Sequence, residues 1–72
     1  MKEFIECREI AERIKDIMSK DVEGFVFDYM VADELGIPYS TFRFAITKNK
    51  PPVKEIALFC YKRKLIINDI IF

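Results

Sequence analysis

The sequence predicts an all-α fold, a small bundle of about five helices forming one domain over residues 1–72. Apolar residues recur at spacings of three and four along several segments, which is the period of an α-helix. Gly36 and the pair Pro51-Pro52 separate these segments and mark helix ends. The chain is 51% hydrophobic and 14% aromatic, so its 72 residues can still form a compact core.

The first predicted helix runs from about Glu3 to Ser19. Its apolar stripe consists of Phe4, Cys7, Ile10, Ala11, Ile14, Ile17 and Met18. The opposite face is charged and includes Glu9 and Arg13, a favourable i,i+4 pair. A partner-binding or membrane-surface role stays open for this helix, but its acidic outer face disfavours anionic lipid. Core packing is the preferred interpretation.

The second predicted helix follows a turn and a short apolar run over residues 21–27, and that run can be extended. Asp28 is expected to be the N-cap of a helix over residues 29–35, because its short carboxylate can accept a bond from a free backbone N–H. Gly36 ends this helix, since glycine readily takes the left-handed conformation that closes a helix C-terminus.

The third predicted helix begins at Pro38 or Tyr39 and ends near Lys48, before a proline pair that cannot continue it. Pro52 in turn opens a fourth helix, where its missing N–H costs nothing. The apolar stripe of this fourth helix comprises Val53, Ile56, Ala57, Phe59 and Cys60.

The last part of the chain combines a basic cluster with an apolar end. Residues 62–64 are all basic and lie where the fourth helix ends, which is favourable for the helix dipole. Asn68 is expected to cap a short final turn that contains the apolar residues 70–72. That apolar end either packs on the core, contacts a second copy, or marks the truncation of a longer protein.

The composition restricts the classes of function. The chain has no His, and two Cys provide no metal-ligand spacing, so we expect neither metal nor cofactor. Cys7 and Cys60 are expected to be reduced and partly buried. Without His, a glycine-rich phosphate loop or a recognisable triad, we expect no enzyme and no small-molecule substrate. With no signal peptide and no apolar run near the roughly 20 residues of a membrane span, we expect a cytoplasmic protein without a membrane partner.

Charge is balanced overall but not along the chain. The formal net charge is zero, yet residues 1–37 carry five basic and ten acidic side chains, whereas residues 38–64 carry seven basic and one acidic. Such a gradient can orient the chain toward phosphate groups. Taken alone, it fits a solvated charge asymmetry without a partner equally well.

Residues 31–46 carry the most informative pattern. Ala32 is small and lies four positions before Gly36, where two helix axes must approach closely. The inner faces of the two helices would then bury Leu35, Ile37, Phe42 and Ala45. This pattern predicts a helix-turn-helix, in which the second helix enters the major groove of DNA. Duplex DNA is therefore the expected partner.

An ordered series of short matches extends this pattern over most of the chain. The series comprises Val31-Ala32, Leu35-Gly36-Ile37, Ser40-Thr41-Phe42, Lys48-Asn49-Lys50, Pro52, Ile56, Phe59-Cys60, Lys62, Ile67-Asn68 and Ile70-Ile71-Phe72. It resembles the helix-turn-helix domain of bacteriophage CI-type repressors over about residues 3–72. The resemblance implies a lambda-repressor-like, all-helical DNA-binding domain that represses transcription as a homodimer, often followed by a C-terminal oligomerisation or peptidase-like domain. The chain would then be either a short stand-alone regulator or a fragment.

Two residues depart from the pattern of that family. Asp69 stands where the family usually has Trp, so the last turn is expected to be less firmly anchored. Phe44 is a large apolar residue on the third helix, where polar residues that read bases are common.

The outward face at the start of the third helix would meet base edges. By helical spacing, that face contains Tyr39, Ser40, Arg43, Phe44 and Thr47. Arg43 is the candidate for a bidentate guanine contact, worth about 1–3 kcal/mol of discrimination, and Tyr39 and Phe44 are candidates for contact with thymine methyl groups. The expected phosphate contacts are Lys48, Lys50 and Lys54. The alternatives are that Arg43 is merely solvated, and that Tyr39 and Phe44 are core or dimer-contact residues.

A second function stays open beside DNA binding. The chain could be a protein-interaction module, such as an anti-repressor, because a helix-turn-helix scaffold does not by itself determine function. The neutral net charge and the acidic first helix favour this alternative, whereas the basic excess after residue 37 favours DNA.

Overall fold

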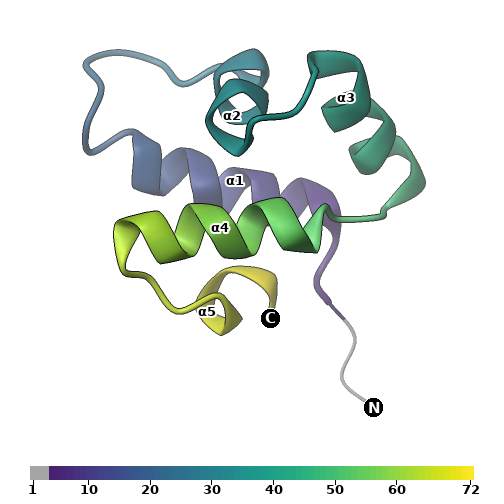
Figure 1. Cartoon of the computed structure of the whole chain (residues 1–72). Helices are drawn as coiled ribbons and strands as arrows, with labels where there is room; N and C mark the ends of the chain where they lie inside the picture. The colour runs from purple at the N-terminus through teal and green to yellow at the C-terminus, as the bar shows by residue number, and fades with distance from the viewer. Residues whose placement is uncertain (1–3) are drawn as a thin grey trace.

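The computed structural model describes residues 4–72, which contain five helices and no strand. The helices are α1 (Cys7–Met18), α2 (Asp28–Leu35), α3 (Tyr39–Lys48), α4 (Val53–Arg63) and α5 (Asn68–Ile71), as Figure 1 shows. The predicted all-α class is confirmed, and four of the five helices begin within a residue of the expected position. α1 begins later than expected, at Cys7; its predicted start at Glu3 lies outside the described residues.

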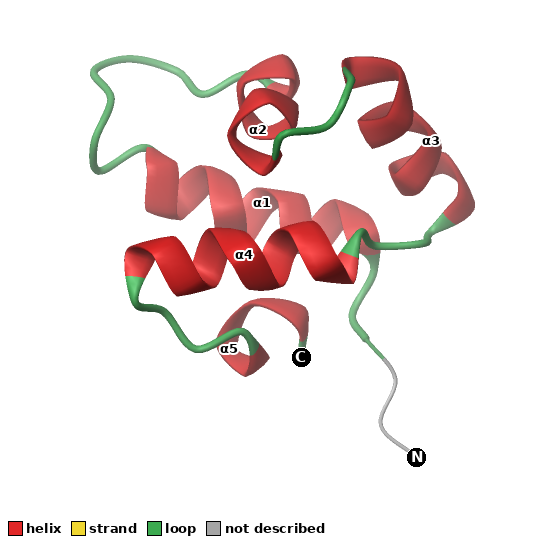
Figure 2. Ribbon diagram, viewed as in Figure 1, coloured by secondary structure: helices red, strands yellow, loops and turns green. Residues whose placement is uncertain are grey.

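The helices pack around α1, which crosses the middle of the molecule (Figure 2). α1 contacts α2, α3 and α5, while α4 contacts α2. The most deeply buried large side chains are Ile10 and Ile14 from α1, Val31 from α2 and Ile56 from α4. No helix in the described range is long and apolar enough to cross a bilayer.

The amphipathic pattern of α1 is confirmed within the helix itself. The buried residues of α1 are Cys7, Ile10, Ala11, Ile14 and Met18. Phe4 was expected in this stripe but is exposed and precedes the helix, where its ring lies 5.5 Å from that of Phe72. Cys7 and Cys60 are both free and buried, as expected.

The first backbone N–H of α1 is satisfied by a residue far away in the sequence. Glu6 occupies the N-cap position but makes no side-chain capping bond. Instead, the Cys7 N–H donates to Oδ1 of Asn49 at 2.7 Å. Since the first N–H groups of a helix have no partner within it, this bond joins the start of α1 to the end of α3.

Three helices end with a residue in the left-handed conformation: Gly36 after α2 (φ 74°), Asn49 after α3 (φ 53°) and Lys64 after α4 (φ 57°). At the first of these, the N–H of Ile37 donates to the Ala32 carbonyl at 3.0 Å, which is the long bond of a Schellman motif. The expected role of Gly36 as the end of α2 is confirmed.

Asp28 does not cap α2, contrary to the sequence-based expectation. Phe27 is the N-cap residue and Asp28 is the first residue of the helix. The Asp28 carboxylate instead forms ion pairs with Lys15 at 2.5 Å and with Arg43 at 3.6 Å. The expectation was wrong because α1 and α3 bring two cations to this carboxylate, which no local pattern reveals.

The apolar C-terminal residues pack on the core. Ile70 and Ile71 of α5 are buried, and the Ile5 N–H donates to the Ile71 carbonyl at 3.0 Å. The Arg13 guanidinium donates to the Asp69 carbonyl at 3.0 Å. The final turn is therefore anchored by burial and by α1, although Asp69 provides no large ring.

Candidate nucleic-acid interface

α3 has one buried face and one exposed face. Phe42 and Ala45 are buried. The expected base-reading residues Tyr39, Ser40, Arg43, Phe44 and Thr47 are all exposed. The possibility that Tyr39 and Phe44 belong to the core is thereby excluded, because both rings are about half exposed (48% and 58%).

The start of α3 is determined by Pro38. Its φ of −61° suits entry into a helix, and its carbonyl accepts a bond from the Phe42 N–H at 3.0 Å. Phe42 is buried and packs the first turn of α3 against the core. The side chains of its neighbours Thr41 and Arg43 face other directions, because consecutive side chains are rotated by about 100° around the helix axis. The exposed face of α3 thus follows from where this one ring is buried.

The three expected phosphate-contacting lysines lie around one connection. Lys48 is the last residue of α3, Lys50 lies in the connection, and Lys54 lies in the first turn of α4. All three are exposed, and none forms an ion pair within residues 4–72. The bond between Asn49 and Cys7 holds this connection on the core.

Arg43, an expected base-reading residue, has a charged partner in Asp28. Its Nη1 lies 3.6 Å from Oδ2 of Asp28, and its side chain is 53% exposed. Lys15 lies closer to the same carboxylate, at 2.5 Å. The hydrogen bond with Asp28 is the main reason that the pKa of Lys15 is raised above 10.5. The Asp28 carboxylate thus pairs with both cations, and the Arg43 side chain stays about half exposed to solvent.

Asp28 thus contacts the candidate interface through an ion pair with Arg43 that the sequence did not predict. Asp28 lies 15 positions before Arg43 and on a different helix, so neither helical nor strand periodicity predicts that the two side chains meet. The link depends on the approach of α2 to α3 and on Lys15 from α1, so only the folded chain reveals it.

Four exposed aromatic side chains gather beside the start of α3. We call Phe25, Phe27, Tyr29 and Tyr39 the aromatic patch; together with Lys15 and Asp28 they line a hollow of about 250 Å³. The rings of Phe25 and Phe27 lie 5.0 Å apart, and those of Phe27 and Tyr29 stack at 5.8 Å. Phe25 is 71% exposed. The sequence predicted only an apolar run over residues 25–27 that can be extended. In the structure Val26 is buried and its two neighbouring rings are exposed, an alternation that is typical of extended backbone.

No three His, Cys, Asp or Glu side chains within residues 4–72 come together as a metal site. Burial raises the pKa of the Cys7 and Cys60 thiols, so both stay protonated at neutral pH.

Comparisons with protein-family models, with curated proteins and with solved structures gave no match.

Proposed function

We propose that this chain binds duplex DNA sequence-specifically as a transcriptional regulator of the repressor type. In this proposal α2, the turn at Gly36 and α3 form a helix-turn-helix, and α3 enters the major groove. The single observation that carries the proposal is the exposed face of α3, which combines hydroxyl, guanidinium and aromatic groups and is followed by three exposed lysines that form no ion pair within residues 4–72. The resemblance to CI-type repressor domains supports the same function.

In the proposed complex, one set of residues contacts bases and another contacts phosphates. Arg43 offers a planar fork of N–H donors that matches O6 and N7 of guanine, and Ser40 and Thr47 can each donate or accept one bond. Lys48, Lys50 and Lys54 contact phosphates and supply affinity that does not depend on sequence.

The test is selection of bound duplexes from a random pool, followed by titration of the best duplex at several salt concentrations. If three lysines per chain neutralise phosphates, the logarithm of the binding constant should fall with that of the salt concentration with a slope of about −2.7 for each bound chain. Lys50→Ala should reduce this slope by about 1 and leave the base preference intact. The matched control is Lys20→Ala, because this exposed lysine belongs to the loop between α1 and α2. Figure 1 shows that this loop and the α3–α4 connection lie at opposite ends of the molecule.

Arg43→Ala should instead relax preference at one base pair, by about 1–3 kcal/mol, with little change in the salt slope. Failure to enrich any duplex at low salt would contradict the proposal. Equal losses for Lys20→Ala and Lys50→Ala would contradict the assignment of the phosphate contacts.

The aromatic patch favours one alternative, a protein-interaction module. Contiguous exposed aromatic rings are typical of protein interfaces, where they act as anchors. In that case a protein partner would bind the wild-type chain, and Phe25→Ser with Tyr29→Ser would abolish this binding while Arg43→Ala would leave it unchanged. A chain that enriches a duplex but shows no such pattern is a DNA-binding protein only.

A further inference from the structure

The aromatic patch leaves four rings in contact with solvent, with exposures that range from 48% for Tyr39 to 71% for Phe25. These rings line a hollow of about 250 Å³. Because hydration of apolar surface is unfavourable, several exposed rings around one hollow are typical of a binding surface. We propose that the aromatic patch binds a proline-rich segment of a partner protein in the polyproline II conformation.

Three of the four rings, those of Phe25, Phe27 and Tyr29, form a continuous row. The ring centroids of Phe25 and Phe27 lie 5.0 Å apart, and those of Phe27 and Tyr29 lie 5.8 Å apart. At these separations neighbouring rings contact each other, so a third flat group cannot enter between them. A ligand must therefore lie along the row.

The length of this row matches one turn of a polyproline II helix. With centroid separations of 5.0 Å and 5.8 Å, the row spans at most about 11 Å from its first ring to its last. A polyproline II helix has three residues per turn and rises about 3.1 Å per residue, so prolines at positions i and i+3 lie about 9 Å apart on one face. One such proline can pack at each end of the row. The expected motif in the partner is therefore Pro-x-x-Pro.

The hydrogen-bonding groups that the patch offers to a ligand can donate. The hydroxyls of Tyr29 and Tyr39 have no hydrogen-bond partner within residues 4–72. The Asp28 carboxylate, which also lines the hollow, is already paired with Lys15 and Arg43. A proline-rich segment suits such a surface, because proline has no N–H and its carbonyl only accepts.

The charges beside the patch compensate one another. Lys15 pairs with Asp28 at 2.5 Å and with Glu12 at 3.7 Å, and Arg43 lies 3.6 Å from Asp28. Two cations thus face two carboxylates, whereas the expected phosphate-contacting lysines lie around the α3–α4 connection. A single nucleic-acid strand needs cations along its phosphates as well as rings for its bases. An uncharged protein segment therefore fits the patch better.

This surface goes beyond the proposed DNA binding and does not depend on it. Tyr39 belongs both to the patch and to the expected base-reading residues, so it is left unchanged in the test. Phe25 and Tyr29 are not expected DNA contacts, and their variants therefore examine the patch alone.

The test is titration of a fluorescently labelled decaproline peptide with the whole chain, measured by fluorescence anisotropy without DNA. A Gly-Ser peptide of the same length is the control ligand, because it has neither the rings nor the preformed extended conformation of polyproline. The chain should bind decaproline with a signal that saturates below about 1 mM, and it should not bind the Gly-Ser peptide.

Two variants examine the parts of the patch separately. Phe25→Ser should weaken decaproline binding at least about fivefold, because it removes a ring from one end of the row. Tyr29→Phe should weaken it about two- to tenfold, because it keeps the ring and removes the donor. Circular dichroism should show that both variants retain the helices of the wild-type chain.

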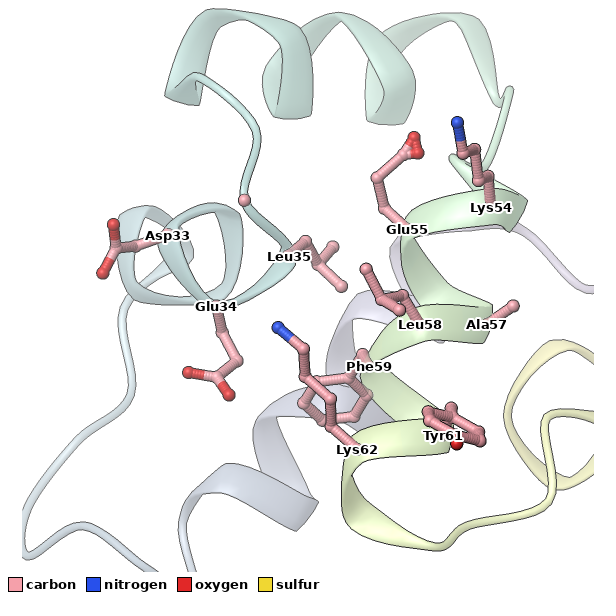
Figure 3. Close-up of a pocket in the computed structure, with 11 residues that line it drawn as sticks. Asp33, Glu34, Leu35, Lys54, Glu55, Ala57, Leu58, Phe59, Tyr61 and Lys62 are labelled. Atoms are coloured by element: carbon pink, nitrogen blue, oxygen red, sulfur yellow. The ribbon is translucent and has the colours of Figure 1, made fainter.

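Tyr61→Ser is the matched control variant. Tyr61 is 81% exposed and lines a different surface, a groove of about 800 Å³ between α2 and α4 that Figure 3 shows. Charged side chains of both signs line that groove, among them Glu55 and Lys62. Tyr61→Ser should leave the affinity for decaproline unchanged.

The proposal is overturned if decaproline does not bind at about 1 mM chain, if the Gly-Ser peptide binds equally well, or if Tyr61→Ser weakens binding as much as Phe25→Ser. Wild-type affinity in Tyr29→Phe would overturn the donor role of the hydroxyl. Binding of a single-stranded decathymidine in place of decaproline, abolished by Phe25→Ser, would assign the rings to unpaired bases instead. Duplex enrichment by a chain that does not bind decaproline would leave the proposed DNA binding standing, so the two failures are distinguishable.

Discussion

Replacing Asn49 should destabilise the fold more than its exposed position suggests. Asn49 ends α3 in the left-handed conformation at φ 53°, and its Oδ1 accepts the Cys7 N–H of α1 at 2.7 Å. Asn49 therefore closes α3 with its backbone and caps α1 with its side chain, which reaches a residue 42 positions away in the sequence. Alanine can do neither, because it lacks the acceptor and disfavours positive φ.

The magnitude follows from adding these two effects. Loss of a capping bond costs about 1 kcal/mol, and forcing alanine into the left-handed region costs about 1 kcal/mol more. We therefore expect Asn49→Ala to lower the free energy of unfolding by about 2 kcal/mol. Asn49→Gly loses the bond but relieves the backbone, so its cost should be within about 0.5 kcal/mol. Asn49→Asp keeps the acceptor beside the positive end of α1, so its stability should stay within about 0.5 kcal/mol of the wild type.

Urea unfolding followed by far-ultraviolet circular dichroism measures these differences, and hydrogen exchange at the Cys7 amide reports the bond itself. The expected order of stability places Asp beside Asn, then Gly, then Ala. If Ala matched the wild type, or if Asp fell as far as Ala, the capping argument would be refuted. Retained protection of the Cys7 amide in Asn49→Ala would refute it as well.

Three further predictions concern stability. Lys64→Gly should raise the free energy of unfolding by about 0.5–1 kcal/mol in urea titrations, because Lys64 holds a positive φ and makes no cap for another helix. Arg63→Ala should lower it by about 1–2 kcal/mol, because Arg63 joins two carboxylates and lies 4.9 Å over the Phe59 ring, and Arg63→Lys should recover only part of this loss. The contribution of the pair between Lys15 and Asp28 should be fully present below pH 10.5, since the folded pKa of Lys15 is raised, and it should be lost as the pH rises through that folded pKa. Alkaline unfolding curves of Asp28→Asn should show a smaller loss over that window than the wild type.

The helices of this chain were predictable because their signals are local. Gly36 ends α2 and Pro38 opens α3 through the φ values that these residues prefer, and the spacing in α1 marks its buried face. The same local logic identified the exposed face of α3, because burial of Phe42 and Ala45 decides which neighbours face solvent. Asp28 shows where local logic fails: its short carboxylate suits an N-cap, but two cations from other helices bind it instead.

The amino-acid sequence by itself determined the number and order of the helices, most of the buried residues of α1 and α4, and the basic character of the segment after residue 37. Ala57 of the predicted α4 stripe is exposed. Only the tertiary structure decided that Asn49 caps α1, that Asp28 joins Lys15 to Arg43, that four aromatic rings gather beside α3, and that a charged groove opens between α2 and α4. The physical reason is the separation along the chain over which each kind of interaction acts. Helix propensity and periodicity act over a few residues, whereas these features depend on side chains that approach one another only after the helices have packed.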